Sequence, residues 1–342
     1  MILQKSELRA FKQSTAAIKT NQVIPVLAYL LLDGNKLIKN NLEAFIIEEI
    51  TVDNTEKLLI DEKTLYNFLD FTTGDTISLT HDTEKIIFAA GGKTTSHPIC
   101  NEPFQLNKPD GDEIFIDFDS ATISSLQIAS NFIDESDIKT ARDYVMVGNS
   151  MVCASNGFIA YFNMCEKLNS DLFLVLDRKV CQSLNGLLRV SFAQNDSYYF
   201  FESEKTLFGF VKPIIEYFDM RFVNKNETDK FFSANKDELI RFNNMCSSQM
   251  TSAFVSSVME FENKLLRLSF YDSGYDMKIN SEVEIDFCTE ERIEKFAYNS
   301  RFLNRILSAI PDEQIFIYRQ EKSILISNKT NSYTTFIQGL II

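Results

Sequence analysis

The chain of 342 residues is poor in the residue types that mark several common protein classes. It has no tryptophan and only 11 glycines and 6 prolines, which excludes collagen-like chains and long Pro/Gly-rich disordered segments. No run of 18 apolar residues occurs, so we expect no membrane-spanning helix. The first residues also lack the basic-then-apolar layout of a signal peptide. These absences predict a soluble, cytoplasmic protein.

The common motifs of catalysis and cofactor binding are missing as well. No GxSxG, GxxxxGK[ST] or GxGxxG segment occurs. The two histidines, His81 and His97, lie near no cysteine or carboxylate pair at metal-ligand spacing, so we expect no metal and no cofactor. The cysteines form no CxxC pair and are typical of buried free thiols in a reducing compartment: Cys100, Cys153, Cys165, Cys181, Cys246 and Cys288. The sequence therefore favours a non-catalytic protein.

Basic residues are outnumbered by acidic ones. The chain has 34 lysines and arginines and 48 aspartates and glutamates, which gives a formal net charge of −14. Such a surplus of acid argues against tight binding of phosphates, which requires Lys and Arg. Net charge does not fix where the charges lie, however. A protein that surrounds DNA can combine a basic inner face with an acidic outer one.

Three segments of the chain resemble one another. Each has an apolar triplet, an Asp or Asn suited to an N-cap, a basic residue two positions later, and apolar residues at helical spacing. The segments are LLIDEKTLYNFL at 58–69, LVLDRKVCQSLN at 174–185 and FAYNSRFLNRIL at 296–307. The expected caps Asp61 and Asp177 are 116 residues apart, and Asp177 and Asn299 are 122 apart. Self-similarity at a fixed period predicts a repeat architecture.

A second set of predicted helices keeps the same period. Its apolar pairs are Leu8 with Phe11, Ile123 with Leu126, and Leu239 with Phe242, spaced by 115 and 116 residues. The intervening segments alternate apolar runs with polar turns, such as the DG turn in VLAYLLLDGNKLI, and are typical of antiparallel strands. We therefore expect three α+β domains, each with two helices packed on antiparallel sheets, at residues 1–109, 110–224 and 225–342.

Local motifs in chain order resemble one known family. They are NQVIPVLAYLLLDGNKL, DYVMVGNSMVCASNGFIAYF, VKPIIEYFDMRFV and the apolar C-terminal FIQGLII. Together they resemble the beta subunit of bacterial DNA polymerase III, the beta sliding clamp, and this sequence looks like a divergent member. The resemblance implies a head-to-tail homodimer whose two chains form a six-domain ring around duplex DNA. It also implies a processivity factor, not an enzyme.

The basic residues expected at DNA lie mostly on helices. Lys5, Arg9, Lys12 and Lys19 form one stripe of the first predicted helix. By resemblance, the other hole-lining residues are Lys139, Arg142, Tyr144, Arg178, Lys179, Arg301 and Arg305. Tyr144 is suited to stacking on an unpaired base. Residues 120–133 contain no Lys or Arg, which predicts a weak field at that helix.

The resemblance further implies a groove between the second and third domains. It would bind linear motifs of the DNA polymerase catalytic subunit and of the clamp loader. Carried over by position, its walls are Val145, Ser155, Gly157, Phe158, Ile159, Ala160, Phe218, Phe222, Val223, Phe336, Ile337, Gln338, Gly339, Leu340, Ile341 and Ile342. The turn and tail depart from the family pattern and predict a more apolar groove.

Three alternatives remain open at the level of the sequence. The first is a β-rich adaptor of three domains with no role at DNA. The second is an enzyme whose α+β domains contain an unrecognised carboxylate site. The third is a clamp of a phage or mobile element, which the divergent turn and tail would suit.

Overall fold

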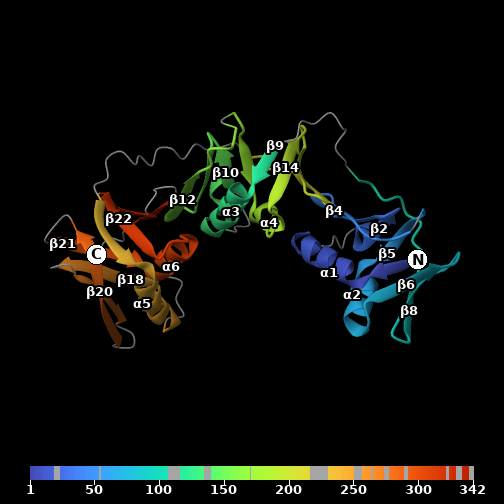
Figure 1. Cartoon of the computed structure of the whole chain (residues 1–342), viewed down its shortest axis with the longest axis horizontal. Coiled ribbons are helices and arrows are strands. Elements are labelled where there is room, and N and C mark those ends of the chain that lie inside the picture. Colours follow the sequence, from blue (N-terminus) through green and yellow to red (C-terminus); the bar gives the residue numbers. More distant parts are fainter. Residues whose placement is uncertain are drawn as a thin grey trace. The chain divides into compact units, whose positions relative to one another are not determined.

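The structure is a computed structural model that describes residues 1–18, 24–53, 55–106, 116–134, 140–169, 171–215, 230–249, 256–262, 265–272, 277–288, 292–320, 323–328 and 333–338. Within these ranges, one order of elements occurs three times: strand, helix, four strands, helix, three strands (Figure 1). No helix of the described part is long and apolar enough to cross a membrane. The repeated order confirms the α+β fold class predicted from the sequence.

The three repeats have the following elements. The first contains β1 (Ile2–Gln4), α1 (Lys5–Ser14), β2 (Tyr29–Asp33), β3 (Lys36–Asn40), β4 (Ala44–Glu49), β5 (Lys57–Asp61), α2 (Glu62–Phe71), β6 (Thr76–His81), β7 (Lys85–Ala90) and β8 (Lys93–Pro98). The second contains β9 (Ile116–Asp119), α3 (Ser120–Ala129), β10 (Val145–Gly148), β11 (Met151–Ser155), β12 (Ile159–Met164), β13 (Leu174–Leu176), α4 (Arg178–Ser183), β14 (Arg189–Gln194), β15 (Tyr198–Glu202) and β16 (Thr206–Val211). The third contains β17 (Lys230–Asn235), α5 (Lys236–Ser248), β18 (Ser256–Glu262), β19 (Leu265–Asp272), β20 (Met277–Cys288), β21 (Arg292–Asn299), α6 (Ser300–Ala309), β22 (Gln314–Gln320), β23 (Ser323–Ser327) and β24 (Tyr333–Gln338). Short 3-10 helices are η1 (Thr15–Ala17), η2 (Pro25–Ala28), η3 (Ser130–Phe132) and η4 (Ala141–Asp143).

Helix starts are fixed by the side chains that the sequence suggested. The carboxylate of Asp61 accepts a hydrogen bond from the backbone N–H of Thr64 at 2.7 Å and caps α2. Asn299 caps α6 in the same way, accepting from the N–H of Arg301 at 3.0 Å. Asn235 caps α5. Each cap satisfies a backbone donor that the helix itself leaves without a partner, so the starts predicted at Asp61 and Asn299 are confirmed.

The chain forms two compact units, each built from two stretches of sequence. The first unit comprises Met1–Ile123 and Lys179–Ile214. It holds a four-stranded sheet of order β1-β6-β7-β8 and an eight-stranded sheet of order β5-β2-β3-β4-β16-β15-β14-β9. The antiparallel pairing of β4 with β16 joins the first repeat to the second.

The second unit comprises Ser124–Arg178 and Ile215–Ile342. Its twelve-stranded sheet has the order β13-β10-β11-β12-β24-β23-β22-β17-β20-β19-β18-β21. Here β12 of the second repeat pairs with β24 of the third. The same strands of the repeat therefore meet in both units: the fourth strand of one repeat pairs with the last strand of the next.

The core follows the predicted apolar faces. On α1 and α2, which lie side by side (Figure 1), Leu8, Phe11, Leu65 and Phe68 are buried. Cys100, Cys153, Cys165, Cys181 and Cys246 are free, and all of these except the half-buried Cys100 are buried, as predicted. The expected domain boundaries near 107–112 and 224–229 lie outside the described residues.

Candidate functional site

The predicted basic stripe of α1 is only partly exposed. Lys5 is 1% exposed, and its ammonium donates to the carbonyl oxygens of Thr72 and Thr73 and to the Thr72 hydroxyl. Its placement at the DNA face is therefore wrong, because the first turn of α1 meets the end of α2 and Lys5 satisfies carbonyls there. Arg9 is exposed as predicted. Lys19 lies outside the described residues.

Lys12 is held by neighbours on α2. Its ammonium forms an ion pair with Asp70 at 2.7 Å and lies 5.3 Å from the centre of the Tyr66 ring. Both charged partners are partly exposed, so the pair contributes little to stability. On this helix pair, Arg9 and Lys12 remain at the surface as candidate phosphate contacts.

The cations of α4 and α6 differ in role. Lys179 is exposed. The guanidinium of Arg178 donates to the carbonyl oxygens of Ser130 at 3.0 Å and Ile133 at 2.6 Å, so it holds the end of the α3–η3 segment. Arg301 is half-buried, whereas Arg305 is exposed. Arg178 is thus a positioning side chain, and Lys179 and Arg305 are the better-exposed cations.

The face of α3 is small and uncharged. Its exposed residues are Ser120, Ala121 and Ser124. The expected weak field at this helix therefore agrees with its exposed side chains. Beyond it, Lys139 lies outside the described residues, and Arg142 on η4 is exposed.

Tyr144 does not stand at a surface. It is 7% exposed and belongs to a cluster with Met146, Met151, Cys153, Ala160, Phe162 and Val175. Burial raises the pKa of its hydroxyl, with Asp177 and Asp143 adding to the rise. The predicted stacking of Tyr144 on a base is wrong, because the side chain is buried in this cluster.

Side-chain hydrogen bonds hold the turn between β11 and β12, which belongs to the predicted peptide groove. The side-chain oxygen of Asn156 accepts hydrogen bonds from the N–H groups of Phe158 and Ile159, both at 3.0 Å. The Asn156 amide donates to Asp134 at 3.2 Å, which ties the turn to the segment after η3. The hydroxyl of Ser155 accepts from the N–H of Gly157 at 3.0 Å. These hydrogen bonds hold the backbone of Gly157 and Phe158 in place.

Gly157 is required by conformation and by space. Its φ is +90°, in the region that favours glycine. A Cβ placed there would lie 3.0 Å from Cζ of Arg142, so the guanidinium rests on the glycine. The sequence singled out both residues, but not their contact.

Phe158 is 47% exposed and stacks on Phe302 of α6, with ring centroids 5.7 Å apart and planes at 27°. Arg305, one turn later on α6, lies 6.0 Å from the centre of the Phe302 ring. The sequence reasoning missed Phe302. The only signal was its position directly after Arg301 in the third copy of the repeated helix start.

Other predicted groove residues lie beneath the surface or outside the described part. Val145 and Ile159 are 0% exposed and Ala160 is 4% exposed, so their expected roles as groove walls are wrong. They lie on β10 and β12 at buried positions. In β24, Phe336 and Ile337 pair in register with Ala160 and Ile159; Gln338 ends the strand. Residues lying outside the described part are Phe218, Phe222, Val223, Gly339, Leu340, Ile341 and Ile342.

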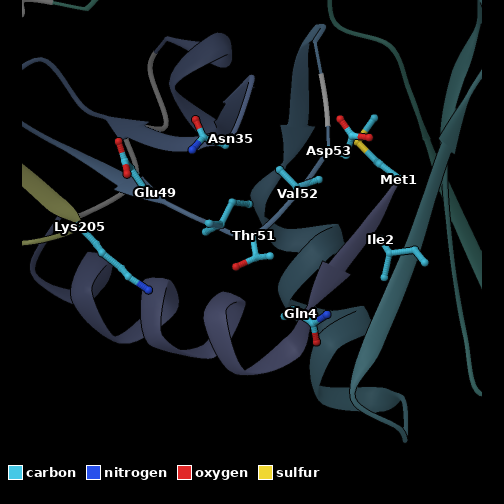
Figure 2. A pocket seen from close by; sticks show the side chains of 10 residues that line it. Met1, Ile2, Gln4, Asn35, Glu49, Thr51, Val52, Asp53 and Lys205 are labelled. Atoms are coloured by element: carbon cyan, nitrogen blue, oxygen red, sulfur yellow. The ribbon is translucent and has the colours of Figure 1, made fainter.

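A separate groove of about 950 Å³ lies in the first unit. Figure 2 shows Glu49 and Lys205 at one end and Asp53 and Met1 toward the other. The N–H of Glu49 donates to the carbonyl of Lys205 at 2.8 Å, so β4 and the turn before β16 together form this end. Among the described residues that line this groove, none was predicted as a site residue from the sequence.

Comparison with solved structures identifies the fold. The chain matches a DNA polymerase III beta subunit sliding clamp from Pseudomonas aeruginosa with a TM-score of 0.87 and 14% identity. It matches the sliding clamp from Caulobacter crescentus with 0.84 and 16%, and the DNA polymerase III beta chain from Streptococcus pneumoniae with 0.86 and 13%. Each match covers 100% of this chain and 99% of the other. No protein-family model and no curated protein matches. The chain thus has the sliding-clamp fold with a divergent sequence.

Proposed function

We propose that this chain is a cytoplasmic DNA sliding clamp, a non-catalytic processivity factor that encircles duplex DNA and tethers a polymerase. The observation that supports this most strongly is the match over the full length of several solved clamps at TM-scores of 0.84–0.87. Each match extends over all three repeats in chain order, rather than over one domain. We accordingly propose three clamp domains at 1–109, 110–224 and 225–342.

Strand pairing supports a ring. Inside the chain, β4 pairs with β16 and β12 pairs with β24, so a fourth strand meets the last strand of the following repeat. Continuing this rule, β20 of the third repeat would meet β8 of a second copy. Within the described residues, β8 pairs only with β7, and residues 277–284 of β20 pair only with β19. Such a head-to-tail contact between unlike surfaces closes a ring when the rotation allows it.

The exposed side chains are suited to weak, sequence-independent binding of DNA. Arg9, Lys179 and Arg305 are exposed cations on three different helices, while the face of α3 is uncharged. Contacts of this kind neutralise phosphates without reading base edges. Sliding requires that no position along the duplex be preferred, so few and sequence-independent contacts fit the proposal.

The turn from Ser155 to Phe158 supports a partner site. It combines backbone held in place by Asn156 with an exposed aromatic side chain, and sites for apolar peptides need both features. We propose that linear motifs of the polymerase catalytic subunit and the clamp loader bind here.

Threading onto linear DNA tests encirclement without a loader. The full chain is incubated at micromolar concentration with a linear duplex whose ends carry biotin, and streptavidin is then added to block the ends. A ring is retained through a wash in high salt and released when a restriction enzyme opens the duplex. A protein that only binds phosphates is lost in the salt wash whether or not the ends are blocked.

A specific observation favours the second candidate, a β-rich adaptor without a role at DNA. The predicted cation Lys5 is buried and α3 is uncharged, in a chain of net charge −14. An adaptor would bind partner peptides yet show no retention on end-blocked DNA, so the threading experiment separates the two candidates.

A further inference from the structure

Corresponding strands of the three repeats can be aligned residue by residue. Counting along the antiparallel ladders from the residue before each first helix leads to one position in each last strand: His97 in β8, Phe210 in β16 and Ile337 in β24. Counting from the strand before each second helix leads to one position in each fourth strand: Ala44 in β4, Ile159 in β12 and Met277 in β20. The two sets mark equivalent positions of the strands that join one repeat to the next.

The two junctions inside the chain pair these positions directly. Ala44 lies opposite Phe210, and Ile159 lies opposite Ile337. Neither pair contains a titratable side chain. In the proposed ring, the same register would place Met277 opposite His97 of a second copy. The junction between two chains would therefore differ from the internal ones, because it includes a side chain that can take up a proton.

The hydrogen bonds of His97 require a neutral imidazole. The side chain is 7% exposed, and its Nε2 accepts from the backbone N–H of Asp61 at 3.3 Å. The ring proton therefore lies on Nδ1, which donates to the carbonyl oxygen of Pro98 at 2.8 Å. The ring also packs against Phe88 and Tyr29, with centroids 5.7 Å and 6.3 Å away. A second proton, on Nε2, would point at the Asp61 N–H and break that hydrogen bond.

The elements around the His97 ring offer a charged imidazole no ready partner. Their titratable side chains are Tyr29 of β2, Asp61 and Glu62 at the start of α2, Lys85 of β7, and Cys100 and Glu102 beyond β8. The Asp61 carboxylate accepts from the N–H of Thr64 at 2.7 Å, and Glu62 is paired with Lys39 at 2.6 Å. Glu102 is exposed. Because burying a charge without a partner is costly, a charged His97 would have to leave its position to be hydrated.

The free edge of β8 is also a weaker partner than the equivalent edge of β16. In the junction of β4 with β16, the N–H of Val211 donates to the carbonyl oxygen of Glu43 at 2.8 Å. The corresponding residue of β8 is Pro98, which has no N–H. A junction formed by β8 would thus lack one backbone hydrogen bond that the internal junction has. Displacement of the neighbouring His97 would act on a strand with few bonds to lose.

We propose that protonation of His97 opens the ring. The neutral imidazole keeps β8 in place to pair with β20 of a second copy, and the charged imidazole displaces it. This inference rests on the proposed clamp function and adds to it a control of ring closure by pH. Histidine is the side chain that changes its charge between about pH 5 and 8. A ring of two chains contains two such junctions, so its separation takes up as many as two protons.

The test is the molar mass of the full chain, followed by light scattering at micromolar concentrations from about pH 8 to about pH 5.5, with circular dichroism at each pH. We expect a dimer at the upper end, and a dissociation constant that rises about tenfold to hundredfold per pH unit as His97 takes up its proton. His97→Phe introduces the residue found at the equivalent position of β16, and this variant should stay dimeric throughout.

The matched control is His81→Gln. His81 is the only other histidine of the chain; it ends β6, and its Nε2 lies 2.7 Å from a carboxylate oxygen of Glu56. This variant should dissociate over the same pH range as the parent chain. If His97→Phe fails to fold, His97→Gln gives the same comparison, because its side-chain oxygen can still accept from the Asp61 N–H.

Each other outcome overturns a different statement. A folded parent chain whose dissociation constant is the same at both ends of the pH range would overturn the switch and leave the ring intact. Equal pH dependence in the parent and in the His97 variants would assign the proton to another group and overturn the role of His97. A parent that stays a single chain at every pH, and is not retained on end-blocked DNA, would overturn the clamp proposal and the switch with it.

Discussion

The ammonium nitrogen of Lys5 lies 2.9 Å from the carbonyl oxygen of Thr72, and this contact fastens the start of α1 to the end of α2. The Lys5 ammonium also donates hydrogen bonds to the Thr72 hydroxyl and the Thr73 carbonyl. A lysine that spacing alone would place on a DNA-facing stripe is therefore part of the fold. This changes which substitutions on α1 should affect stability and which should affect DNA.

Replacing Lys5 with methionine should lower the free energy of unfolding by about 2 kcal/mol, because buried carbonyls lose their donor. Urea unfolding followed by circular dichroism measures the change. The matched control is Arg9→Met on the same helix, which should alter stability by no more than about 0.5 kcal/mol while weakening retention on DNA. A stable Lys5→Met chain with weakened retention would reverse the roles assigned to the two residues.

Gly157→Ala should weaken peptide binding, because the new methyl group meets the Arg142 guanidinium and φ is +90°. Gly186 provides a control of similar backbone conformation, since its φ is +81° and no atom lies within 4 Å of an added Cβ. Both substitutions should cost about 1 kcal/mol in unfolding measurements. Only Gly157→Ala should reduce affinity for a fluorescein-labelled linear-motif peptide of the polymerase catalytic subunit, by about fivefold or more. Equal binding by the two variants would contradict the role of Gly157.

Glu48 should make stability depend on pH. Burial raises the pKa of its carboxyl, against a hydrogen bond from Ser14 that lowers it. The folded chain therefore holds the charged form at a cost at neutral pH, and that cost disappears as the pH falls through the raised pKa. Glu48→Gln should unfold at a higher temperature than the parent at pH 7.5, and the difference should vanish near pH 4. A variant that is less stable at pH 7.5 would show that the charge is favourable in the fold.

Thiol reactivity should separate Cys246 from Cys100. Burial raises the pKa of the Cys246 thiol to about 11, whereas Cys100 is half-buried. Only the thiolate attacks iodoacetamide, so at pH 8 Cys100 should be alkylated first and Cys246 should react only in urea. Mass spectrometry of the digested chain reports both sites. Early modification of Cys246 would mean that α5 opens readily.

The threefold repeat could be predicted from the sequence because the residues that mark it act on backbone groups close to them in the chain. Asp61 and Asn299 cap helices a few residues away, and capping depends on short-range geometry. The site was less readable because it depends on contacts between distant segments. Helical spacing places Lys5 on one side of α1 but does not say that α2 ends there. Phe158 and Phe302 come from different repeats and meet only when β12 and α6 pack. Residue type alone suits Tyr144 to stacking on a base, and its packing against distant residues such as Met151 and Phe162 decides its burial.

Molar mass in solution tests the clamp account most directly, because the proposed pairing of β20 with β8 requires a second chain. Within the described residues, β8 pairs only with β7, and residues 277–284 of β20 pair only with β19. Light scattering on a sizing column at micromolar concentration should give about twice 39.3 kDa. Ser96→Pro on β8, which removes a backbone donor that points away from β7 toward the free edge of the strand, should shift the mass toward a single chain. A parent chain that stays at 39.3 kDa across a tenfold range of concentration, and on end-blocked DNA as well, would contradict the ring.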